Sequence, residues 1–173
     1  MKKVLIIEKI HESGIELLKA RKDFTYEVVE KLDINFLKKK IKDCDAITLK
    51  LSKLNKELIE AAPKLKIISR FGVGYNNVDL VSAKKKSITL AITAGVLDAS
   101  VAEHVFFMML SISRGVNKYD KFVRDGNFSE RYNLDLTKEL WKQKILIAGF
   151  GRVGKNLIKK CKGFEMNVFV YDP

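Results

Sequence analysis

The sequence contains few residues of the kinds that bind metals or form disulfides: it has two cysteines and two histidines in 173 residues. Cys44 and Cys161 form neither a metal-binding spacing nor a redox motif. We therefore expect no metal site. Because a cysteine-poor chain of this kind suits a reducing compartment, we expect a cytoplasmic protein.

Long hydrophobic runs are also absent. No apolar run approaches the ~20 residues needed to cross a bilayer. The N-terminal segment 1–8 has too short an apolar run for a signal peptide and lacks a small-residue cleavage site. We expect this segment to form a first strand and the protein to have no membrane partner. Internal repeats and low-complexity tracts are absent as well.

Acidic residues are fewer than basic ones, 21 against 33, which gives a formal net charge of +12. A charge of this sign suggests nucleic-acid binding as one possible function. The lysines are, however, spread along the chain and interleaved with acids, and no aromatic residues accompany them in a stacking pattern. We expect solvated helix faces, a positive field that suits small anions, and no nucleic-acid partner.

Short apolar runs alternate with helix-like segments along the whole chain, whose composition is 47% hydrophobic and 31% charged. The expected strands are 4–7, 24–29, 46–49, 65–69, 88–92, 144–148 and 167–171; the expected helices are 14–20, 33–41 with Asp33 as cap, 57–62, 78–84, 100–115 and 153–162. This repeated strand–helix–strand spacing predicts an α/β protein with a parallel sheet covered by helices on both faces.

A predicted helix from Ser100 divides the chain into two expected domains, 1–98 and 99–173. Ser100 and Glu103 have the spacing of a capping box, and Gly115 is a plausible stop. The helix is apolar nearly all round, so we expect it to be buried between layers as a crossover between the domains. Residues 116–141 are more polar and are expected to form an irregular arm.

The most informative motif is the glycine stretch 149–154, which lies between a predicted strand and a predicted helix. In a dinucleotide-binding unit Gly149 permits the tight turn, Gly151 lets the backbone approach a pyrophosphate, and Gly154 lets the helix pack on the strand. Asp172 follows the next strand, where a carboxylate accepts hydrogen bonds from a ribose and favours NAD over NADP. A glycine-rich turn in an unrelated sheet is the alternative.

Three sequence blocks then resemble the D-isomer-specific 2-hydroxyacid dehydrogenases, especially their 3-phosphoglycerate dehydrogenase branch. The blocks are 70–79, similar to R-x-G-x-G-x-D-N-[IV]-D with Asn76 in place of the acid; 93–104, similar to T-P-G-x-x-x-x-S-V-A-E-H with Ala94 in place of proline; and the cofactor segment 149–154, 163–168 and 171–173. The resemblance covers essentially the whole chain. It implies a flavodoxin-like parallel-sheet substrate domain followed by an incomplete Rossmann, or doubly wound, dinucleotide-binding domain.

The resemblance implies hydride transfer between NAD and a D-2-hydroxy acid such as 3-phosphoglycerate. It assigns the pyrophosphate segment, including Arg152 and Val153, to the cofactor. The backbone of Gly72, Val73 and Gly74 would hold the substrate carboxylate, with Val73 also beside the nicotinamide. Lys50, where the family often has arginine, and Arg70 would supply positive charge to the acid, although both could equally be ordinary surface cations.

No catalytic residue is expected within the chain. His11 and His104 match no catalytic position of the family, and His104 is expected to be a satisfied core or hinge residue. The family's catalytic arginine, glutamate and histidine lie downstream of the segment that matches 171–173. We therefore expect an inactive N-terminal half that dimerises with a second copy through the arm. A non-enzymatic, dinucleotide-responsive binding protein on the same scaffold is the alternative.

Overall fold

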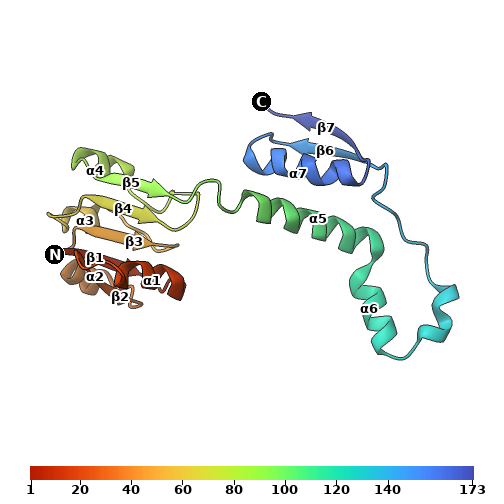
Figure 1. The fold of residues 1–173 in the computed structure, drawn as a ribbon, viewed down its shortest axis with the longest axis horizontal. Helices are drawn as coiled ribbons and strands as arrows, with labels where there is room; N and C mark the ends of the chain where they lie inside the picture. Colours follow the sequence, from red (N-terminus) through yellow and green to blue (C-terminus); the bar gives the residue numbers. More distant parts are fainter. The chain divides into compact units, whose positions relative to one another are not determined.

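The structure, a computed structural model, describes all 173 residues and divides into two compact units, Met1–Ala94 and Gly95–Pro173 (Figure 1). The first unit holds a five-stranded sheet in which every neighbouring pair of strands is parallel, in the order β2-β1-β3-β4-β5. Its elements are β1 (Lys2–Ile7), α1 (Glu12–Lys19), β2 (Phe24–Val29), α2 (Ile34–Ile41), β3 (Ala46–Leu49), α3 (Lys56–Glu60), β4 (Ile67–Arg70), α4 (Leu80–Lys85) and β5 (Thr89–Ile92).

The two faces of this sheet carry separate cores, because successive side chains of a strand point to opposite faces. On β1, Leu5 and Ile7 belong to the larger cluster, which α2, α3 and α4 complete. Val4 and Ile6 belong to a smaller cluster with Ile15 of α1. All four β1 side chains are buried, and burying a side chain of this size stabilises the fold by roughly 1.5–3 kcal/mol. The expected α/β unit with helices on both faces is confirmed.

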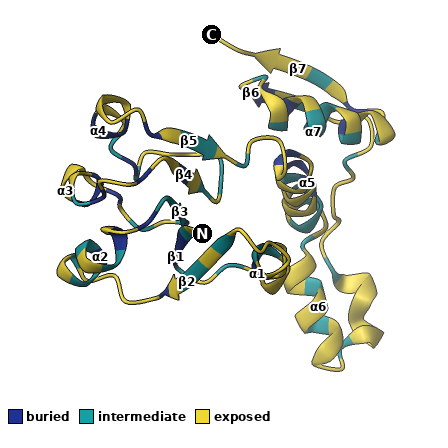
Figure 2. Ribbon diagram, turned by 60° about the vertical axis from the view of Figure 1, so that its left-hand side comes forward, coloured by how far each residue is buried: buried dark blue, intermediate teal, exposed yellow.

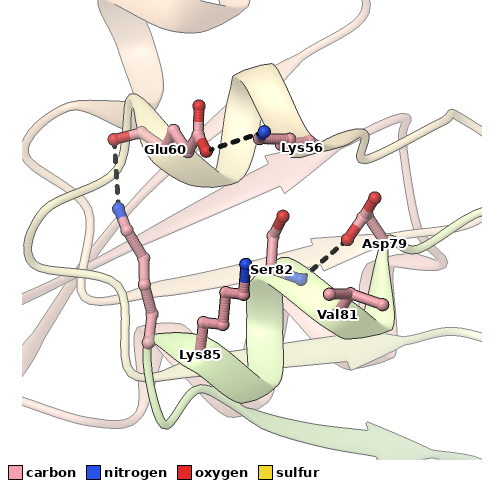
Figure 3. Close-up of a pocket in the computed structure, with 7 residues that line it drawn as sticks. Lys56, Glu60, Asp79, Val81, Ser82 and Lys85 are labelled. Atoms are coloured by element: carbon pink, nitrogen blue, oxygen red, sulfur yellow. Dashed lines mark hydrogen bonds and ion pairs between the residues drawn. The ribbon is translucent and has the colours of Figure 1, made fainter.

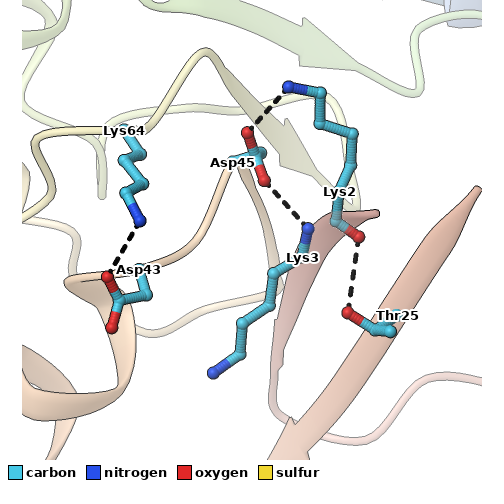
Figure 4. Close-up of polar contacts among 6 residues, drawn as sticks. All are labelled: Lys2, Lys3, Thr25, Asp43, Asp45 and Lys64. Atoms are coloured by element: carbon cyan, nitrogen blue, oxygen red, sulfur yellow. Dashed lines mark hydrogen bonds and ion pairs between the residues drawn. The ribbon is translucent and has the colours of Figure 1, made fainter.

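Polar contacts fix the register of β1 and β3 where these strands begin (Figure 4). The Lys3 amide donates to Asp45 Oδ2 at 2.9 Å, and Lys2 Nζ lies 3.2 Å from Asp45 Oδ1. The hydrogen bond from Lys3 lowers the pKa of the Asp45 carboxyl, and the ammonium of Lys2 adds to the effect. The backbone amide of Asp45 in turn donates to Lys3 O at 2.9 Å. Asp45 therefore stays ionised while it joins the two central strands.

Side-chain caps begin the helices of this unit. Asp33 accepts from the Phe36 amide at 2.8 Å, as predicted. Asn55 and Asp79 cap α3 and α4 in the same way. His11 also acts as a cap, because its Nδ1 accepts from the Ser13 amide at 3.2 Å at the start of α1.

The second unit contains a long helix, an arm and one strand–helix–strand. Its elements are α5 (Asp98–Arg114), α6 (Val116–Arg124), the 3-10 helix η1 (Phe128–Asn133), β6 (Lys144–Ala148), α7 (Arg152–Gly163) and β7 (Asn167–Tyr171). β6 and β7 pair in parallel with each other and with no other strand. The core of the unit lies where α5 packs on α7, with Ala102, Phe106, Leu157 and Cys161 at its centre.

The expected capping box at the start of α5 is wrong. The helix begins at Asp98 with no side-chain cap, so Ser100 and Glu103 lie inside it. The second unit leaves the outer face of α5 uncovered (Figure 2); Phe107 is 59% and Ile112 82% exposed. The sequence showed that the helix was apolar nearly all round, but in this chain one face alone is covered. The predicted stop is confirmed, because Gly115 adopts the left-handed conformation at φ 60°.

The arm is more regular than expected. α6 has no buried residue, but Tyr119 and Val123 are spaced as one face of a helix. The Tyr119 hydroxyl donates to Asp135 O at 2.8 Å, and Lys118 Nζ lies 2.6 Å from Asp135 Oδ2, which ties α6 to the returning chain. None of the helices has the length and apolar character needed to cross a membrane.

Candidate functional site

The candidate substrate site lies where the parallel strands of the first unit end. Because the carboxyl ends of parallel strands meet at one edge, Glu8 after β1, Lys50 after β3 and Arg70 at the end of β4 are brought to the same edge. Leu49 is the register partner of Arg70, so Lys50 and Phe71 follow side by side. Lys50 Nζ lies 5.9 Å from the centre of the Phe71 ring, and Lys50 forms no ion pair.

Arg70 folds back over the loop that follows its own strand. Its Nη1 donates to Phe71 O at 2.9 Å, while its Nε is buried without a hydrogen-bond partner. Gly72 has φ 142°, and a Cβ built there would collide with the Arg70 guanidinium. The backbone angle therefore favours glycine at 72, and any larger residue would also displace the Arg70 guanidinium from its present position.

A small pocket opens beside this loop. It has a volume of about 190 Å³ and is lined by Leu51, Arg70, Gly74, Asn76 and Asn77. The structure thus brings together Arg70 and Gly74 from the predicted substrate set. Lys50, Gly72 and the half-buried Val73 lie at the same edge but do not line the pocket.

Sequence reasoning missed two residues of this edge, Glu8 and Asn77. Glu8 Oε2 accepts from the amides of Lys50, Leu51 and Ser52 at 3.2, 3.0 and 2.9 Å. Asn77 Nδ2 donates to Lys50 O at 3.1 Å and to Ser52 O at 2.7 Å. The position of Glu8 directly after the first strand, equivalent to that of Lys50 after the third, was a signal that could have indicated Glu8.

The environment of Glu8 keeps its carboxyl ionised. Burial acts to raise its pKa, but the hydrogen bonds that it accepts at Ser52, Lys50 and Leu51 outweigh this effect and lower the pKa below its ordinary value. Burial raises the pKa of the two free thiols, Cys44 and Cys161, so neither is an activated nucleophile.

The glycine motif lies between β6 and α7 in the second unit. Gly149 has φ 96°, a conformation that favours glycine, and its amide donates to Tyr171 O at 2.7 Å. A Cβ at Gly149 or Gly151 would meet no atom within 4 Å, so the backbone there is open to a ligand. A Cβ at Gly154 would lie 2.5 Å from Gly149 O, so only glycine allows α7 this close to the turn. Gly149 and Gly154 thus meet the requirements predicted for the turn and for the helix packing, and Gly151 has open space beside its backbone.

The N-terminus of α7 is open to an anion. Gly151 is the N-cap residue, and no side chain accepts a hydrogen bond from the first amides of the helix. Arg152 is exposed at the first helical position, but its Nε lies 3.1 Å from Oδ2 of the buried Asp98. Val153 is half-buried and packs against the core of this unit.

Asp172 lies beside the glycine motif, directly after β7. It is exposed, and its Oδ2 accepts from the Phe150 amide at 2.8 Å. The structure therefore brings the acid and the glycine turn together, as the sequence spacing indicated, and gives the carboxylate a backbone contact that was not foreseen.

The two histidines are the remaining candidates. His104 is exposed on α5 within the second unit, with its ring centre 5.9 Å from that of Phe107, so it is not a core residue of this unit. His11 is used as a helix cap. No cluster of three or more histidine, cysteine, aspartate or glutamate side chains could hold a metal ion.

A second pocket of the first unit, about 270 Å³, lies between α3 and α4 instead of at the strand ends (Figure 3). Lys56 pairs with Glu60 at 3.7 Å, and Lys86 Nζ donates to the backbone oxygen of Glu60 at 3.0 Å. Asp79 accepts from the Ser82 amide at 2.7 Å as the cap of α4. These contacts use four of the polar groups around this pocket as parts of the fold: Lys56, Glu60, Asp79 and Lys86.

Comparison with known proteins gives a consistent result. Residues 4–165 match the model of the D-isomer specific 2-hydroxyacid dehydrogenase catalytic domain. The glyoxylate reductase of Pyrococcus furiosus is 36% identical over 98% of this chain and 52% of its own length. The D-3-phosphoglycerate dehydrogenase of Archaeoglobus fulgidus is 33% identical over 99% of this chain and 32% of its own length.

Solved structures extend the comparison to the fold. The 2-hydroxyacid dehydrogenase of Ketogulonicigenium vulgare matches with a TM-score of 0.86 at 28% identity, over 98% of this chain and 54% of that one. The D-lactate dehydrogenase of Aquifex aeolicus, solved with NAD and lactic acid, matches with a TM-score of 0.82 at 29% identity, over 98% of this chain and 51% of that one. The chain spans about half the length of the glyoxylate reductase and of both solved structures.

Proposed function

Because the chain belongs to the D-isomer specific 2-hydroxyacid dehydrogenase family, we propose that it is the substrate-binding half of an NAD-dependent oxidoreductase, together with the first part of the NAD site. The observation that carries the proposal is the pocket at the carboxyl edge of the five-stranded sheet, where Arg70 and Gly74 meet. In open α/β sheets ligands bind outside this edge.

The proposed substrate is a small 2-hydroxy or 2-oxo acid. A volume of about 190 Å³ is below the roughly 300–1,000 Å³ of pockets for larger ligands, and it suits an acid of a few heavy atoms. The amides of Gly72, Val73 and Gly74 would hold its carboxylate, with Arg70 beside them. Lys50 supplies a second cation, with no carboxylate of the protein paired to its ammonium. As a single ammonium it gives up the bidentate contact of an arginine.

The proposed cofactor is NAD, and the residues fit it. Gly149, Gly151 and Gly154 provide an open turn against α7, where the helix N-terminus and Arg152 would hold the pyrophosphate and Val153 would support the loop. Asp172 would accept hydrogen bonds from the ribose. When bound, the nicotinamide would accept or donate the hydride. The residues of this chain would bind and orient the cofactor and the substrate.

We also propose the domain limits 1–98 and 99–173, with the second forming the start of a Rossmann domain. A larger sheet in the whole protein is supported by the unpaired edge of β6. It is also supported by exposed apolar residues on both strands, Leu146 of β6 at 67% and Phe169 of β7 at 56%. The exposed arm residues Tyr132 and Trp141 support a homodimer. Neither histidine is placed as a base, so the chain alone is expected to give no turnover.

Ligand binding to the isolated chain tests this function. Heteronuclear NMR should show that oxalate, a stable mimic of a 2-oxo acid, shifts the amides of 72–74, and that ADP-ribose shifts those of 149–154. Lys50→Met should weaken oxalate binding, whereas the matched control Lys53→Met, an exposed lysine that lines a different pocket, should not. Oxalate shifts scattered over the surface would contradict the substrate site. Shifts by ADP-ribose alone would favour a dinucleotide-responsive binding protein.

A further inference from the structure

The loop 50–52 is held by one side chain in an unusual way. The amides of Lys50, Leu51 and Ser52 all donate to a single oxygen, Oε2 of Glu8, at 2.9–3.2 Å. Successive N–H groups that point to one place form a nest, a concave site that binds anions. Here the protein fills the nest with its own carboxylate.

Glu8 makes this contact from an unfavourable backbone conformation. Its φ is 69°, in the left-handed region that residues other than glycine seldom occupy. The Glu8 amide donates to Val29 O at 2.9 Å, which anchors the residue at the end of β1. Residues held in such a conformation by the surrounding structure are concentrated at functional sites.

Asn77 holds the same loop from its carbonyl side. Its Nδ2 donates to Lys50 O and to Ser52 O, and its own carbonyl accepts from the Leu54 amide at 2.8 Å. The backbone of Lys50 is therefore fixed on both sides, by Glu8 through its amide and by Asn77 through its carbonyl. Both contacts come from elements far away in the sequence.

These contacts fix the backbone of Lys50 and leave its ammonium without an ion-pair partner in the protein. Glu8 is satisfied by backbone amides, and the ammonium of Lys50 pairs with no carboxylate. The ammonium lies over the face of the Phe71 ring, and Phe71 directly precedes the loop 72–74. A cation on a rigid base, free of a protein counter-ion, is suited to an anionic ligand.

We propose that Glu8 and Asn77 are positioning residues, which brace the loop 50–52 so that Lys50 is presented to the anionic group of the substrate. This inference deepens the function proposed above and rests on it. In this proposal the amides of 50–52 bind the Glu8 carboxylate and are not available to the substrate. The substrate carboxylate therefore binds to the amides of the loop 72–74.

The brace, by which we mean the hydrogen bonds from Glu8 and Asn77 to the loop 50–52, is tested by removing the Glu8 carboxylate and then supplying a carboxylate from solution. Glu8→Gly removes the side chain and relieves the positive φ, so it should fold. Glu8→Gly removes the three charge-assisted hydrogen bonds to the loop. Amide hydrogen exchange at 50–52 should therefore become at least about tenfold faster, and the affinity for oxalate should fall about tenfold. Glu8→Gln, which keeps an acceptor oxygen, should recover part of both.

Formate is the direct probe of the nest. In Glu8→Gly it should slow exchange at 50–52 toward the wild-type rate, while it should leave wild type and the control Glu12→Ala unchanged; Glu12 pairs with Lys19 on the surface. Unchanged exchange in Glu8→Gly would overturn the brace. Faster exchange with unaltered oxalate affinity would overturn the positioning of Lys50. If wild type itself bound no oxalate, the proposed substrate site would fail, and the formate result would still decide whether Glu8 fills the nest.

Discussion

Replacement of Gly154 by alanine tests whether the glycine motif is shaped by close packing. The new Cβ would lie 2.5 Å from Gly149 O and 3.4 Å from Ile147 Cγ2. Because the first of these is a backbone atom, the turn or α7 must move. Overpacking of this kind costs about 1–3 kcal/mol, and the better helix propensity of alanine offsets about 1 kcal/mol of it. We expect a net destabilisation of up to about 2 kcal/mol.

Gly163→Ala is the matched control for this change. Gly163 is the last residue of the same helix, and a Cβ there would meet no atom within 4 Å. This variant should be neutral or more stable by up to about 1 kcal/mol. Because both variants convert glycine to alanine in α7, the gain in helix propensity is shared and they should differ by the packing cost alone, roughly 2 kcal/mol.

Urea unfolding measures the difference. Trp141 is the single tryptophan and lies in the second unit, so its fluorescence reports on that unit. With an m value of about 1–2 kcal/mol per molar urea, the midpoint of Gly154→Ala should fall about 1–2 M below that of Gly163→Ala. Equal midpoints would refute the packing argument.

Three further results are expected. In the whole enzyme, Asp172→Ala should weaken NAD binding and narrow the preference over NADP, as kinetic measurements with both cofactors would show; NADP use equal to NAD use before mutation would contradict the assignment. The lowered pKa of Asp45 stabilises the fold above its ordinary pKa near 4, and this contribution is lost as the pH falls through the lower, folded value, so the loss of thermal stability between pH 5 and pH 2 should be smaller in Asp45→Asn. Light scattering should show association through the arm, which Tyr132→Ser combined with Trp141→Ser should reduce; a clean monomer at high concentration would contradict it.

The strands of the fold were predictable because each is a short apolar run with a polar boundary. The run 4–7 and the cap at Asp33 carried enough local information to be predicted from the sequence. The start of α5 was not predictable in this way, since the Ser100–Glu103 pattern suits a cap but the backbone is already helical from Asp98. The exposure of its outer face depends on which segments cover it, which a residue pattern does not encode.

The candidate sites likewise contain parts that were predictable from the sequence and parts that were not. The glycine turn 149–154 was predictable because backbone conformation restricts Gly149, and close packing restricts Gly154, to glycine. The brace at 50–52 was not, because it joins the end of β1 to the end of β3 and to Asn77, and such contacts exist only once the sheet has formed. Arg70 carried a charge signal, but its hydrogen bond to the backbone oxygen of Phe71 depends on the loop geometry.

The most direct measurement is turnover by a completed enzyme. The chain fused to the C-terminal half of the Pyrococcus furiosus glyoxylate reductase, the part that this chain does not match, should oxidise NADH with glyoxylate or another small 2-oxo acid. The chain alone should not, and Lys50→Met in the fusion should raise KM more than it lowers kcat. Turnover by the chain alone that survives His11→Ala and Asp172→Ala would contradict the account. So would a folded fusion that binds NADH but reduces no 2-oxo acid.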